Sequence, residues 1–300
     1  MDRKINILLL VNSLKDKDFS ISCDVTSYLL NEVGRDITIY TLADNVSKVP
    51  GCFVYNNQKV DFALVLGGDG TLLNYAQRFR DRDFPFFGIN LGRVGCLTEA
   101  TIDNFKDKLL QIINGNYFIE ERNTITCEIL KNNKEVIKNL AFNEVSLQRG
   151  RLFKMLLINM FVNNNNKTSF YADGLVVATP TGSSAFSLSC GGPLLLPTAK
   201  NYVITPINPQ LRTITSLVVN DTDIISIDIC ERNIRELFDL EKPIVVIDGA
   251  KMVEIDRDDK INLYKSDKKL KIIKVDGEAS LFEPTLKVAM SSQNISKQED

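Results

Sequence analysis

The chain has 300 residues, 44% hydrophobic and 25% charged, which is ordinary for a globular protein and long enough for two domains. A net charge of −2 gives no electrostatic indication of nucleic-acid or anionic-membrane binding. The absence of histidine excludes Ser-His-Asp, Cys-His and histidine-zinc chemistry, so any general base must be a carboxylate, lysine, tyrosine or cysteine. Six scattered cysteines without a CxxC pair, a start without signal-peptide features and no membrane-length apolar run favour a cytoplasmic protein.

The first third of the chain alternates strand-like and helix-like segments. Apolar runs predict strands at 5–11, 37–42, 62–66 and 84–89, and helical spacing predicts helices at 19–32, 72–79 and 101–115. Gly115 stands where the C-cap of the last helix is expected. This alternation predicts a parallel sheet with helices on its faces, in which ligands bind beyond the carboxyl ends of the strands.

From about residue 117 the chain becomes a series of short β-rich segments separated by turn signals. The runs KNNK at 131–134 and NNNNK at 163–167 are typical of hairpin tips. We therefore expect an α/β domain at 1–116 and an all-β, sandwich-like domain at 117–292, whose C-terminal end can return to pack on the first domain. The polar tail at 293–300 is expected to be frayed.

The most informative segment is DFALVLGGDGT at 61–71, an apolar strand followed by a glycine turn and a helix that starts near Leu72 with Thr71 as its cap. The glycines let backbone N–H groups approach a phosphate, which a helix N-terminus also favours. Asp69 places a carboxylate at the same point, where it suits proton acceptance from a hydroxyl or a share in binding a divalent cation. An ordinary hairpin turn is the alternative, and the double glycine after a buried strand disfavours it.

Three further segments carry polar groups in suggestive places. GINLGRVG at 88–95 fits neither the dinucleotide fingerprint nor a Walker loop, and is either a second phosphate- or ribose-facing loop or a tight connection. In AFNEVSL, either Asn143 or Glu144 must point inward and needs a partner, from the protein or from a ligand. Asp173 begins DGLVVATPTGSSAFSLSCGG, whose hydroxyls and open backbone donors suit ribose and diphosphate oxygens.

Together these segments resemble the NAD kinase family, which phosphorylates the adenosine-ribose 2′-hydroxyl of NAD. LGGDGTLL, GINLGRVGCLTEA, AFNEVSL, DGLVVATPTGSSAFSLSCGGP and ITPINPQ occur in the family's order over roughly residues 62–215, with a weaker match continuing to SLFEPTLK. GGDGT alone is shared with phosphofructokinases and diacylglycerol-type lipid kinases, whereas TPTGSSAFSLS singles out NAD kinases.

The resemblance implies an ATP-dependent NAD kinase with an α/β domain and a β-sandwich domain. Asp69 would accept the proton of the ribose hydroxyl, and Gly67, Gly68, Gly70 and Thr71 would lie at the ATP phosphates. A divalent metal, Mg²⁺, would accompany ATP, and the protein would form a homodimer or homotetramer in which a neighbouring subunit completes the pocket. The implied NAD-binding residues are Asp69, Gly70, Asn143, Glu144, Lys154, Tyr171, Asp173, Thr181, Ser184, Ala185, Phe186, Ser187, Leu188 and Ser189, with Asp173 at the nicotinamide end.

Three positions depart from the family's pattern. Phe186 stands where tyrosine is common, Gln210 replaces a frequent histidine, and Ala250 follows the Asp248-Gly249 turn where a polar residue is common. A diacylglycerol-type lipid kinase and a non-catalytic NAD- or NADP-sensing protein are the alternatives. Activity on a lipid but not on NAD would identify the first, and dinucleotide binding without turnover would identify the second.

Overall fold

The structure, a computed structural model, describes residues 4–92, 95–132, 134–151, 154–211, 213–229 and 242–277. The chain divides into two compact units. The first contains the chain up to Glu121 and the segment that begins at Leu270, and the second contains Arg122–Lys269. The predicted domain boundaries stay predictions, and the SLFEPTLK segment and the polar tail lie outside the described residues.

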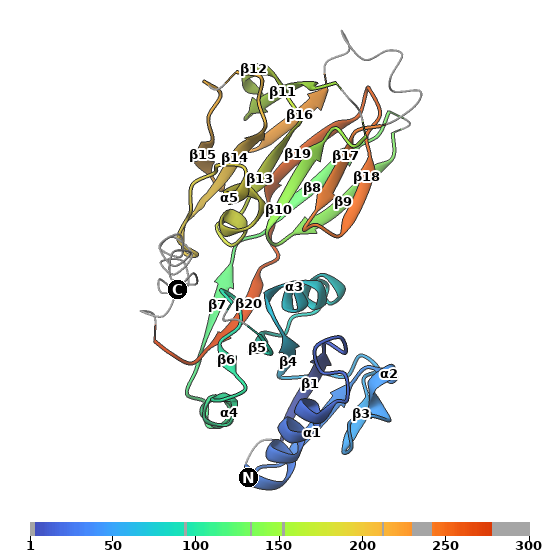
Figure 1. The fold of residues 1–300 in the computed structure, drawn as a ribbon, viewed down its shortest axis with the longest axis vertical. Helices are drawn as coiled ribbons and strands as arrows, with labels where there is room; N and C mark the ends of the chain where they lie inside the picture. Colours follow the sequence, from blue (N-terminus) through green and yellow to red (C-terminus); the bar gives the residue numbers. More distant parts are fainter. Residues whose placement is uncertain are drawn as a thin grey trace, which may run out of the picture. The chain divides into compact units, whose positions relative to one another are not determined.

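The first unit is built on an eight-stranded sheet (Figure 1). The pairs that join β1 to β2 and β4, β2 to β3, and β4 to β5 are parallel, which confirms the predicted parallel sheet. β20 also runs parallel to β5, with Ile272 opposite Phe86, so a strand from far along the chain completes this sheet. In spatial order the strands are β3 (Cys52–Val54), β2 (Ile37–Thr41), β1 (Ile5–Val11), β4 (Phe62–Gly67), β5 (Phe86–Asn90), β20 (Leu270–Lys274) and β7 (Phe118–Arg122), with β6 (Ala100–Thr101) paired to β5.

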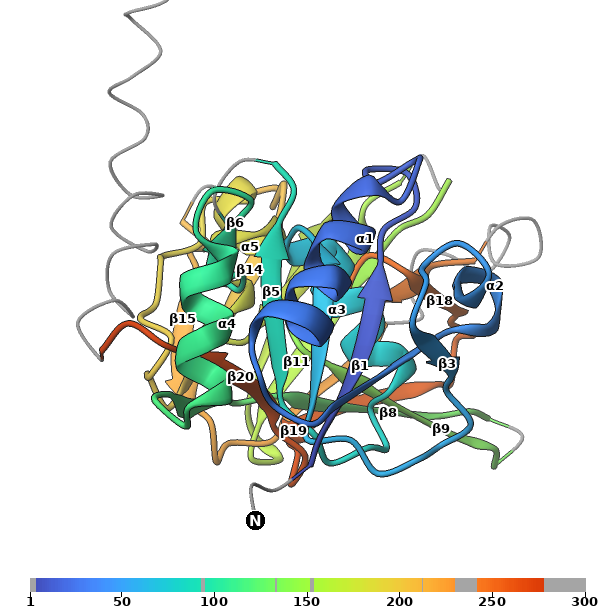
Figure 2. The same cartoon turned by 90° about the horizontal axis from the view of Figure 1, so that it is seen from below.

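Helices cover both faces of this sheet (Figure 2). On one face, α1 and α4 lie against alternate strand residues, since Ile7 and Leu9 of β1 share a buried cluster with Val25 of α1 and Leu109 of α4. On the other face lies α3, whose Leu72 would contact a side chain added at Gly88. The helices are α1 (Ser20–Ser27), which continues as the π-helical turn η1 (Tyr28–Glu32), α2 (Ala43–Val46), α3 (Asp69–Arg78) and α4 (Phe105–Ile113).

Two helix starts differ from the sequence prediction. α3 begins at Asp69 rather than Leu72, and Gly68 is its N-cap, so the prediction that Thr71 caps this helix is wrong. The Thr71 hydroxyl instead accepts a hydrogen bond of 2.8 Å from the Asn12 side chain. α4 begins four residues later than predicted, because residues 100–101 form β6. Its predicted end is confirmed, since Gly115 has φ +81° and donates its N–H to the Ile112 carbonyl.

The second unit consists of two six-stranded sheets, and the pairs described in them are antiparallel. Val145 and Leu175 of one sheet share a buried cluster with Ile158 and Ile227 of the other, so the two inner faces make one core, which confirms the sandwich. One sheet contains β15 (Leu217–Asn220), β14 (Asn201–Ile207), β13 (Gly174–Ala178), β10 (Glu144–Gln148), β17 (Ile244–Ile247) and β18 (Lys251–Glu254). The other contains β12 (Asn165–Ala172), β11 (Leu156–Val162), β16 (Ile225–Ile229), β19 (Lys260–Lys265), β8 (Ile125–Leu130) and β9 (Val136–Ala141).

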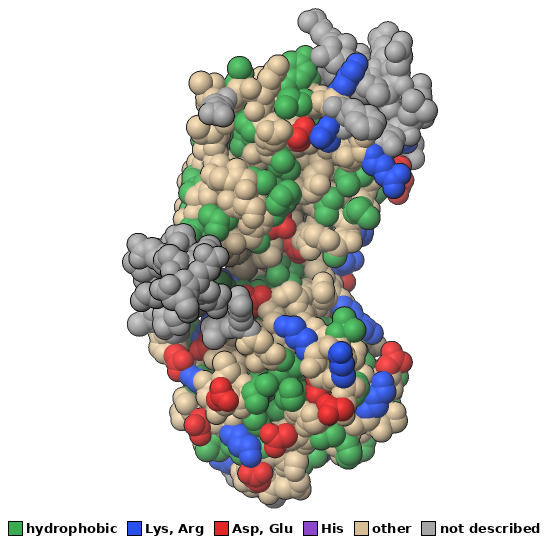
Figure 3. Space-filling view, in the orientation of Figure 1, with side chains coloured by type: hydrophobic (Ala, Val, Ile, Leu, Met, Phe, Trp, Pro, Cys, Tyr) green, Lys and Arg blue, Asp and Glu red, His purple; other side chains and the backbone are tan. Residues whose placement is uncertain are grey.

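Two short helices, η2 (Gly182–Ser184) and α5 (Phe186–Ser189), lie on the connection from β13 to β14. The β11–β12 hairpin turns at Asn163 and Asn164, both with positive φ, as predicted for the asparagine run. Among the described residues no helix is both long and apolar enough to cross a membrane. On the face of the first unit drawn in Figure 3, acidic and basic side chains are interspersed, in keeping with the small net charge.

Candidate functional site

The glycine turn after β4 lies at the carboxyl end of the parallel sheet. All six residues of β4 are buried, and the chain passes through Gly67 and Gly68 directly into α3. A Cβ added at Gly67 would lie 2.5 Å from the Thr71 hydroxyl, so only glycine fits there. Gly70 is exposed, and no described residue lies within 4 Å of a Cβ added there. The turn therefore presents the first N–H groups of a ten-residue helix at the sheet edge where ligands of such folds bind.

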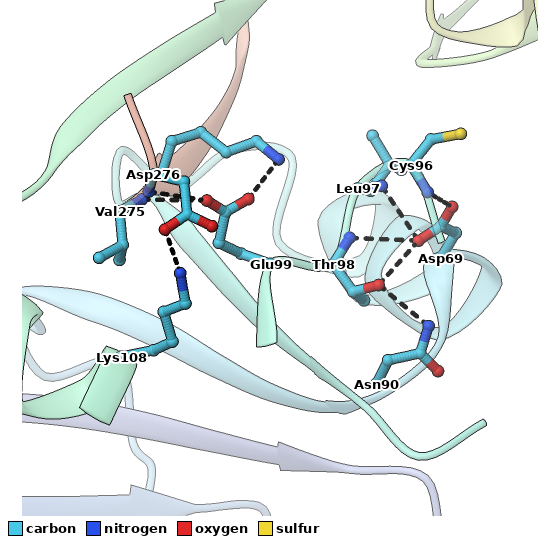
Figure 4. A network of polar contacts seen from close by, with 10 residues as sticks. Asp69, Asn90, Cys96, Leu97, Thr98, Glu99, Lys108, Val275 and Asp276 are labelled. Atoms are coloured by element: carbon cyan, nitrogen blue, oxygen red, sulfur yellow. Dashed lines mark hydrogen bonds and ion pairs between the residues drawn. The ribbon is translucent and has the colours of Figure 1, made fainter. Parts of the chain in front are cut away.

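The carboxylate of Asp69 is wrapped by the loop that follows β5 (Figure 4). Oδ2 accepts the Cys96 N–H at 2.6 Å, and Oδ1 accepts the Leu97 N–H at 3.1 Å together with the Thr98 N–H and hydroxyl at 3.2 and 3.3 Å. A Cβ at Gly95 would lie 2.1 Å from Oδ1, so the glycine makes room for the carboxylate. Among the described residues, Oδ2 is bonded to the Cys96 N–H alone, so one of its lone pairs is available for a further donor, such as a substrate hydroxyl.

The wrapping loop is itself anchored to the strand that returns from the end of the chain. Lys274 of β20 forms a buried ion pair of 2.7 Å with Glu99, and the other oxygen of Glu99 accepts the N–H groups of Val275 and Asp276. Asp276 in turn is paired with Lys108 of α4. Figure 4 shows this cluster and the Asp69 cluster as neighbours along the same segment. The loop after β5 is thus bonded to Asp69 of α3 at residues 96–98 and to β20 and the two residues after it at Glu99.

Sequence reasoning missed two residues of this region, Asn12 and Lys15. Asn12 receives the Leu14 N–H on its side-chain oxygen and donates to Thr71, which ties the loop after β1 to the glycine turn. The exposed Lys15 ammonium lies 3.3 Å from a Cβ added at Gly68 and 3.4 Å from one added at Gly92. The polar run NSLK directly after an apolar strand was the available signal, since it marks the same carboxyl edge as the glycine turn.

In the second unit, Asn143 and Glu144 lie at the start of β10. Glu144 is 7% exposed, and its Oε2 has no hydrogen-bond partner among the described residues. Burial, and then the neighbouring carboxylate of Asp248, raise the pKa of Glu144 to about 7. Burial and the charge of Glu144 also raise the pKa of the nearby Cys190 thiol. A buried carboxylic group near neutrality with an unused oxygen is suited to binding hydroxyl groups.

The loop after β13 brings Thr181 and Ser184–Ser189 to this same end of β10. Ser184 is half-buried, but Ser187 is fully buried and its hydroxyl lies 2.9 Å from that of Thr205. A Cβ at Gly192 would come within 2.3 Å of the Ser187 hydroxyl, so a glycine is required beside it. Ala185, Phe186 and Leu188 are half-buried and Ser189 is exposed. The two serine hydroxyls therefore differ: that of Ser187 is hydrogen-bonded in the interior, whereas Ser184 lies closer to the surface.

The remaining predicted residues, Lys154, Tyr171 and Asp173, lie at the opposite end of the second unit. Asp173 precedes Gly174, which pairs with Gln148, four residues along β10 from Glu144 and about 14 Å away at strand spacing. The Asp173 carboxylate pairs with Arg149 at 3.1 Å and accepts a hydrogen bond from the Asn208 side chain at 3.0 Å. Tyr171 pairs with Leu157 on β11, and Lys154 is exposed just before that strand.

Within the described part of the chain, no cluster of three or more cysteine, aspartate or glutamate side chains could hold a metal ion. At the glycine turn, Asp69 offers Oδ2 as its less occupied oxygen, since Oδ1 is bonded to residues 97 and 98. One such oxygen is not by itself the ligand set of a resident metal ion. A divalent cation bound through substrate phosphates would need few protein ligands.

Fold and sequence together define a kinase. A model of the ATP-NAD kinase N-terminal domain matches residues 54–117, and a model of the ATP-NAD kinase C-terminal domain matches residues 142–275. The NAD kinase of Thermoanaerobacter sp. (strain X514) is 34% identical over 279 residues, covering 91% of this chain and 94% of the relative. That of Flavobacterium johnsoniae is 36% identical over 225 residues, covering 74% and 73%. The chain belongs to the NAD kinase family, which confirms the resemblance found in the sequence.

Two solved structures share the fold. A yeast NADH kinase complexed with NADH superposes with a TM-score of 0.85 at 19% identity, covering all of this chain and 91% of that one. An NAD kinase from Archaeoglobus fulgidus in complex with ATP gives 0.72 at 24% identity, covering 95% and 99%. The α/β unit followed by a β-sandwich is therefore the architecture of NAD and NADH kinases.

Proposed function

We propose that this protein transfers the γ-phosphoryl group of ATP to the adenosine-ribose 2′-hydroxyl of NAD and so produces NADP. The observation that carries the proposal is the position of the Asp69 carboxylate, at the first residue of α3 beside a glycine turn, with Oδ2 bonded to the Cys96 N–H alone among the described residues. The names of the family models and of the relatives support the activity.

In this mechanism the first unit binds the ATP phosphates and accepts the proton of the attacking hydroxyl. The backbone at Gly67, Gly68 and Gly70, the Thr71 hydroxyl and the Lys15 ammonium bind the ATP phosphates, with the divalent metal entering as part of the nucleotide substrate. Asp69 orients the attacking hydroxyl through Oδ2. Because transition states of phosphoryl transfer are loose, Asp69 accepts the proton late in the reaction.

The second unit supplies the proposed NAD contacts. Asn143 and Glu144 bind ribose hydroxyls, with Thr181, Ser184, Ala185, Phe186, Leu188 and Ser189 around the adenosine and Ser187 contributing through the backbone. Lys154, Tyr171 and Asp173, at the other end of β10, are proposed for the nicotinamide end of a dinucleotide. We propose a cytoplasmic homodimer or homotetramer in which a neighbouring subunit completes the pocket.

The direct test is an assay of purified, folded protein with NAD, ATP and Mg²⁺. Formation of NADP is expected, and its absence would sink the proposal. Diacylglycerol as acceptor is the control for a lipid kinase, and NAD binding in calorimetry without turnover would favour a dinucleotide sensor. Asp69→Asn should retain NAD binding and lose turnover by about 10²- to 10⁴-fold, the usual range for a general base. Unchanged turnover would remove Asp69 from that role.

A further inference from the structure

The backbone at Phe142, Asn143 and Glu144 is held by one carboxylate from a distant turn. Asp248, between β17 and β18, accepts three successive N–H groups, that of Phe142 at 2.8 Å on Oδ2 and those of Asn143 and Glu144 at 2.7 and 3.1 Å on Oδ1. Its own N–H donates back to the Glu144 carbonyl at 3.0 Å. Asp248 makes these bonds at φ +47°, a conformation that an aspartate adopts more readily than most residues. The carboxylate thus does more than complete a hairpin turn.

A single threonine holds the same backbone from the other side. The fully buried Thr179 donates its hydroxyl to the Phe142 carbonyl at 2.7 Å and its N–H to the Asn143 carbonyl at 2.8 Å. The Thr179 oxygen also accepts the Gly182 N–H at 3.1 Å. A Cβ at Gly182 would lie 2.2 Å from the Asn143 carbonyl oxygen, so the loop after β13 packs directly on this backbone.

These contacts account for every backbone polar group of the three residues. Three N–H groups go to the Asp248 carboxylate, two carbonyls go to Thr179, and the Glu144 carbonyl goes to the Asp248 N–H. Buried backbone groups need such partners. Because two residues make all six bonds, they also fix the backbone conformation of residues 142–144. The side chains of Asn143 and Glu144 remain for a ligand, and Oε2 of Glu144 has no partner in the part of the chain that the structure describes.

We propose that Thr179 and Asp248 are positioning residues that fix the directions in which Asn143 and Glu144 present their side chains to NAD. The substrate in this statement rests on the proposed function. Neither residue needs to touch the dinucleotide, because each acts through the backbone that carries the binding side chains. Displacement of a binding group by about 1 Å is enough to lower activity strongly, so the loss of one of these bonds should be visible in NAD recognition.

The test compares Thr179→Val, which removes the hydroxyl at nearly constant shape, with Thr179→Ser, which retains it. Thr179→Val should raise KM for NAD about tenfold, because the Phe142 carbonyl and the Gly182 N–H both lose their partner, while KM for ATP stays within about twofold. Thr179→Ser, which keeps the hydroxyl, should have the wild-type KM for NAD. Thr41→Val is the matched control, because Thr41 is equally buried and donates its hydroxyl to the Leu9 carbonyl at 2.9 Å in the first unit.

A second readout does not depend on activity. In hydrogen exchange, the amides of residues 142–144 should exchange about tenfold faster in Thr179→Val and in Asp248→Asn than in the wild type or Thr179→Ser. Asp259→Asn is the control for the carboxylate, since Asp259 accepts the Asn132 and Asp256 N–H groups elsewhere in this unit. If Thr179→Val does not fold, Asp248→Asn makes the same test from the other side.

Wild-type KM for NAD in Thr179→Val, or an equal rise in Thr41→Val, would overturn the proposal. So would unchanged exchange at 142–144 in both Thr179→Val and Asp248→Asn. A wild-type protein that neither binds NAD nor makes NADP would instead overturn the proposed function and the substrate assigned here. The exchange comparison would then still decide whether the two residues hold the backbone.

Discussion

Thr98 donates both its backbone N–H and its hydroxyl to Oδ1 of Asp69, at 3.2 and 3.3 Å. The Thr98 hydroxyl also accepts a hydrogen bond of 3.1 Å from the Asn90 side chain at the end of β5. The proposed base is therefore part of the framework that joins β5 to its following loop (Figure 4). Its orientation is fixed before any substrate arrives, which is the condition for efficient positioning in phosphoryl transfer.

Gly95→Ala tests this arrangement without altering the carboxylate. The added methyl would lie 2.1 Å from Oδ1 of Asp69, so either the loop or the carboxylate must move. We expect turnover to fall by about 10²-fold or more, approaching the loss in Asp69→Asn. Steady-state kinetics checks this, with Gly277→Ala as control because no described residue lies within 4 Å of its added methyl. Full activity in a folded Gly95→Ala protein would show that the orientation of the Asp69 carboxylate seen here is not required for its role as the base.

Lys15→Met should weaken the donor side of the reaction. With the ammonium beside Gly68 and Gly92 removed, we expect KM for ATP to rise about tenfold, since a charge-assisted contact to phosphate contributes about 1.5–3 kcal/mol. KM for NAD should change little. Lys17→Met, two residues along the same exposed loop, is the matched control. Equal rises in KM for ATP in the two variants would mean that Lys15 acts through the general positive charge of the surface and not through a specific contact with phosphate.

The buried ion pair of Lys274 and Glu99 should matter for stability. Their side chains are 3% and 6% exposed, so Lys274→Met leaves an uncompensated charge in the interior and should cost about 3–5 kcal/mol in the free energy of unfolding. The double variant Lys274→Met/Glu99→Gln should recover part of this loss. Lys4→Met, in the exposed 3.9 Å pair with Asp36, should cost less than about 1 kcal/mol. Urea unfolding gives all three values, and equal costs for the two lysines would contradict the prediction.

The strands and the glycine turn were predictable because local composition determines them. The apolar run before Gly67 and the predicted strand at 5–11 match β4 and β1, and the phosphate-type turn lies at the expected sheet edge. Sheet membership over long distance was not predictable in the same way. β20 (Leu270–Lys274) is the example, because no local pattern shows that Ile272 pairs with Phe86 nearly two hundred residues earlier.

The candidate site shows the same limit. Asp69 could be identified from the glycines that flank it in the sequence. Its partners at Cys96–Thr98 could not, because they are backbone N–H groups, which almost every residue has. Asp248 reads as a turn residue, and its turn conformation is real, yet its carboxylate serves a segment more than a hundred residues away. Ser187 and Ser184 look alike in the sequence, and only packing directs one inward and the other outward.

These two serines allow a direct separation of stability from recognition. Ser187→Ala leaves the buried Thr205 hydroxyl without its 2.9 Å partner and should lower the free energy of unfolding by about 1–3 kcal/mol. Ser184→Ala should change stability by less than about 0.5 kcal/mol, because among the described residues its hydroxyl makes a single, 3.4 Å contact, with the Thr181 carbonyl, but it should raise KM for NAD. Denaturant unfolding and kinetics on both variants test this, and the reverse pattern would show that the inward and outward roles are misassigned.

Glu144 gives the protein a predictable pH dependence. Its pKa is about 7 in the folded state, raised by burial first and by Asp248 second, against 4.5 for the free side chain. An acid with a raised folded-state pKa contributes stability below pH 4.5, and this contribution is lost as pH rises through 7, because ionising the buried group then opposes folding. Asp248 and the Cys190 thiol are the titratable groups that interact with it.

Glu144→Gln removes this titration and should therefore unfold with a flatter pH profile between pH 4.5 and 7.5. Above pH 7.5 its free energy of unfolding should exceed that of the wild type by up to about 3 kcal/mol, the equivalent of the pKa shift. At pH 4.5 the two proteins should differ little, since the wild-type side chain is then neutral as well. Paired urea titrations at several pH values make the comparison, and other titrating groups cancel in the difference. A constant difference across this range would mean that the pKa of Glu144 in the folded protein is close to that of the free side chain.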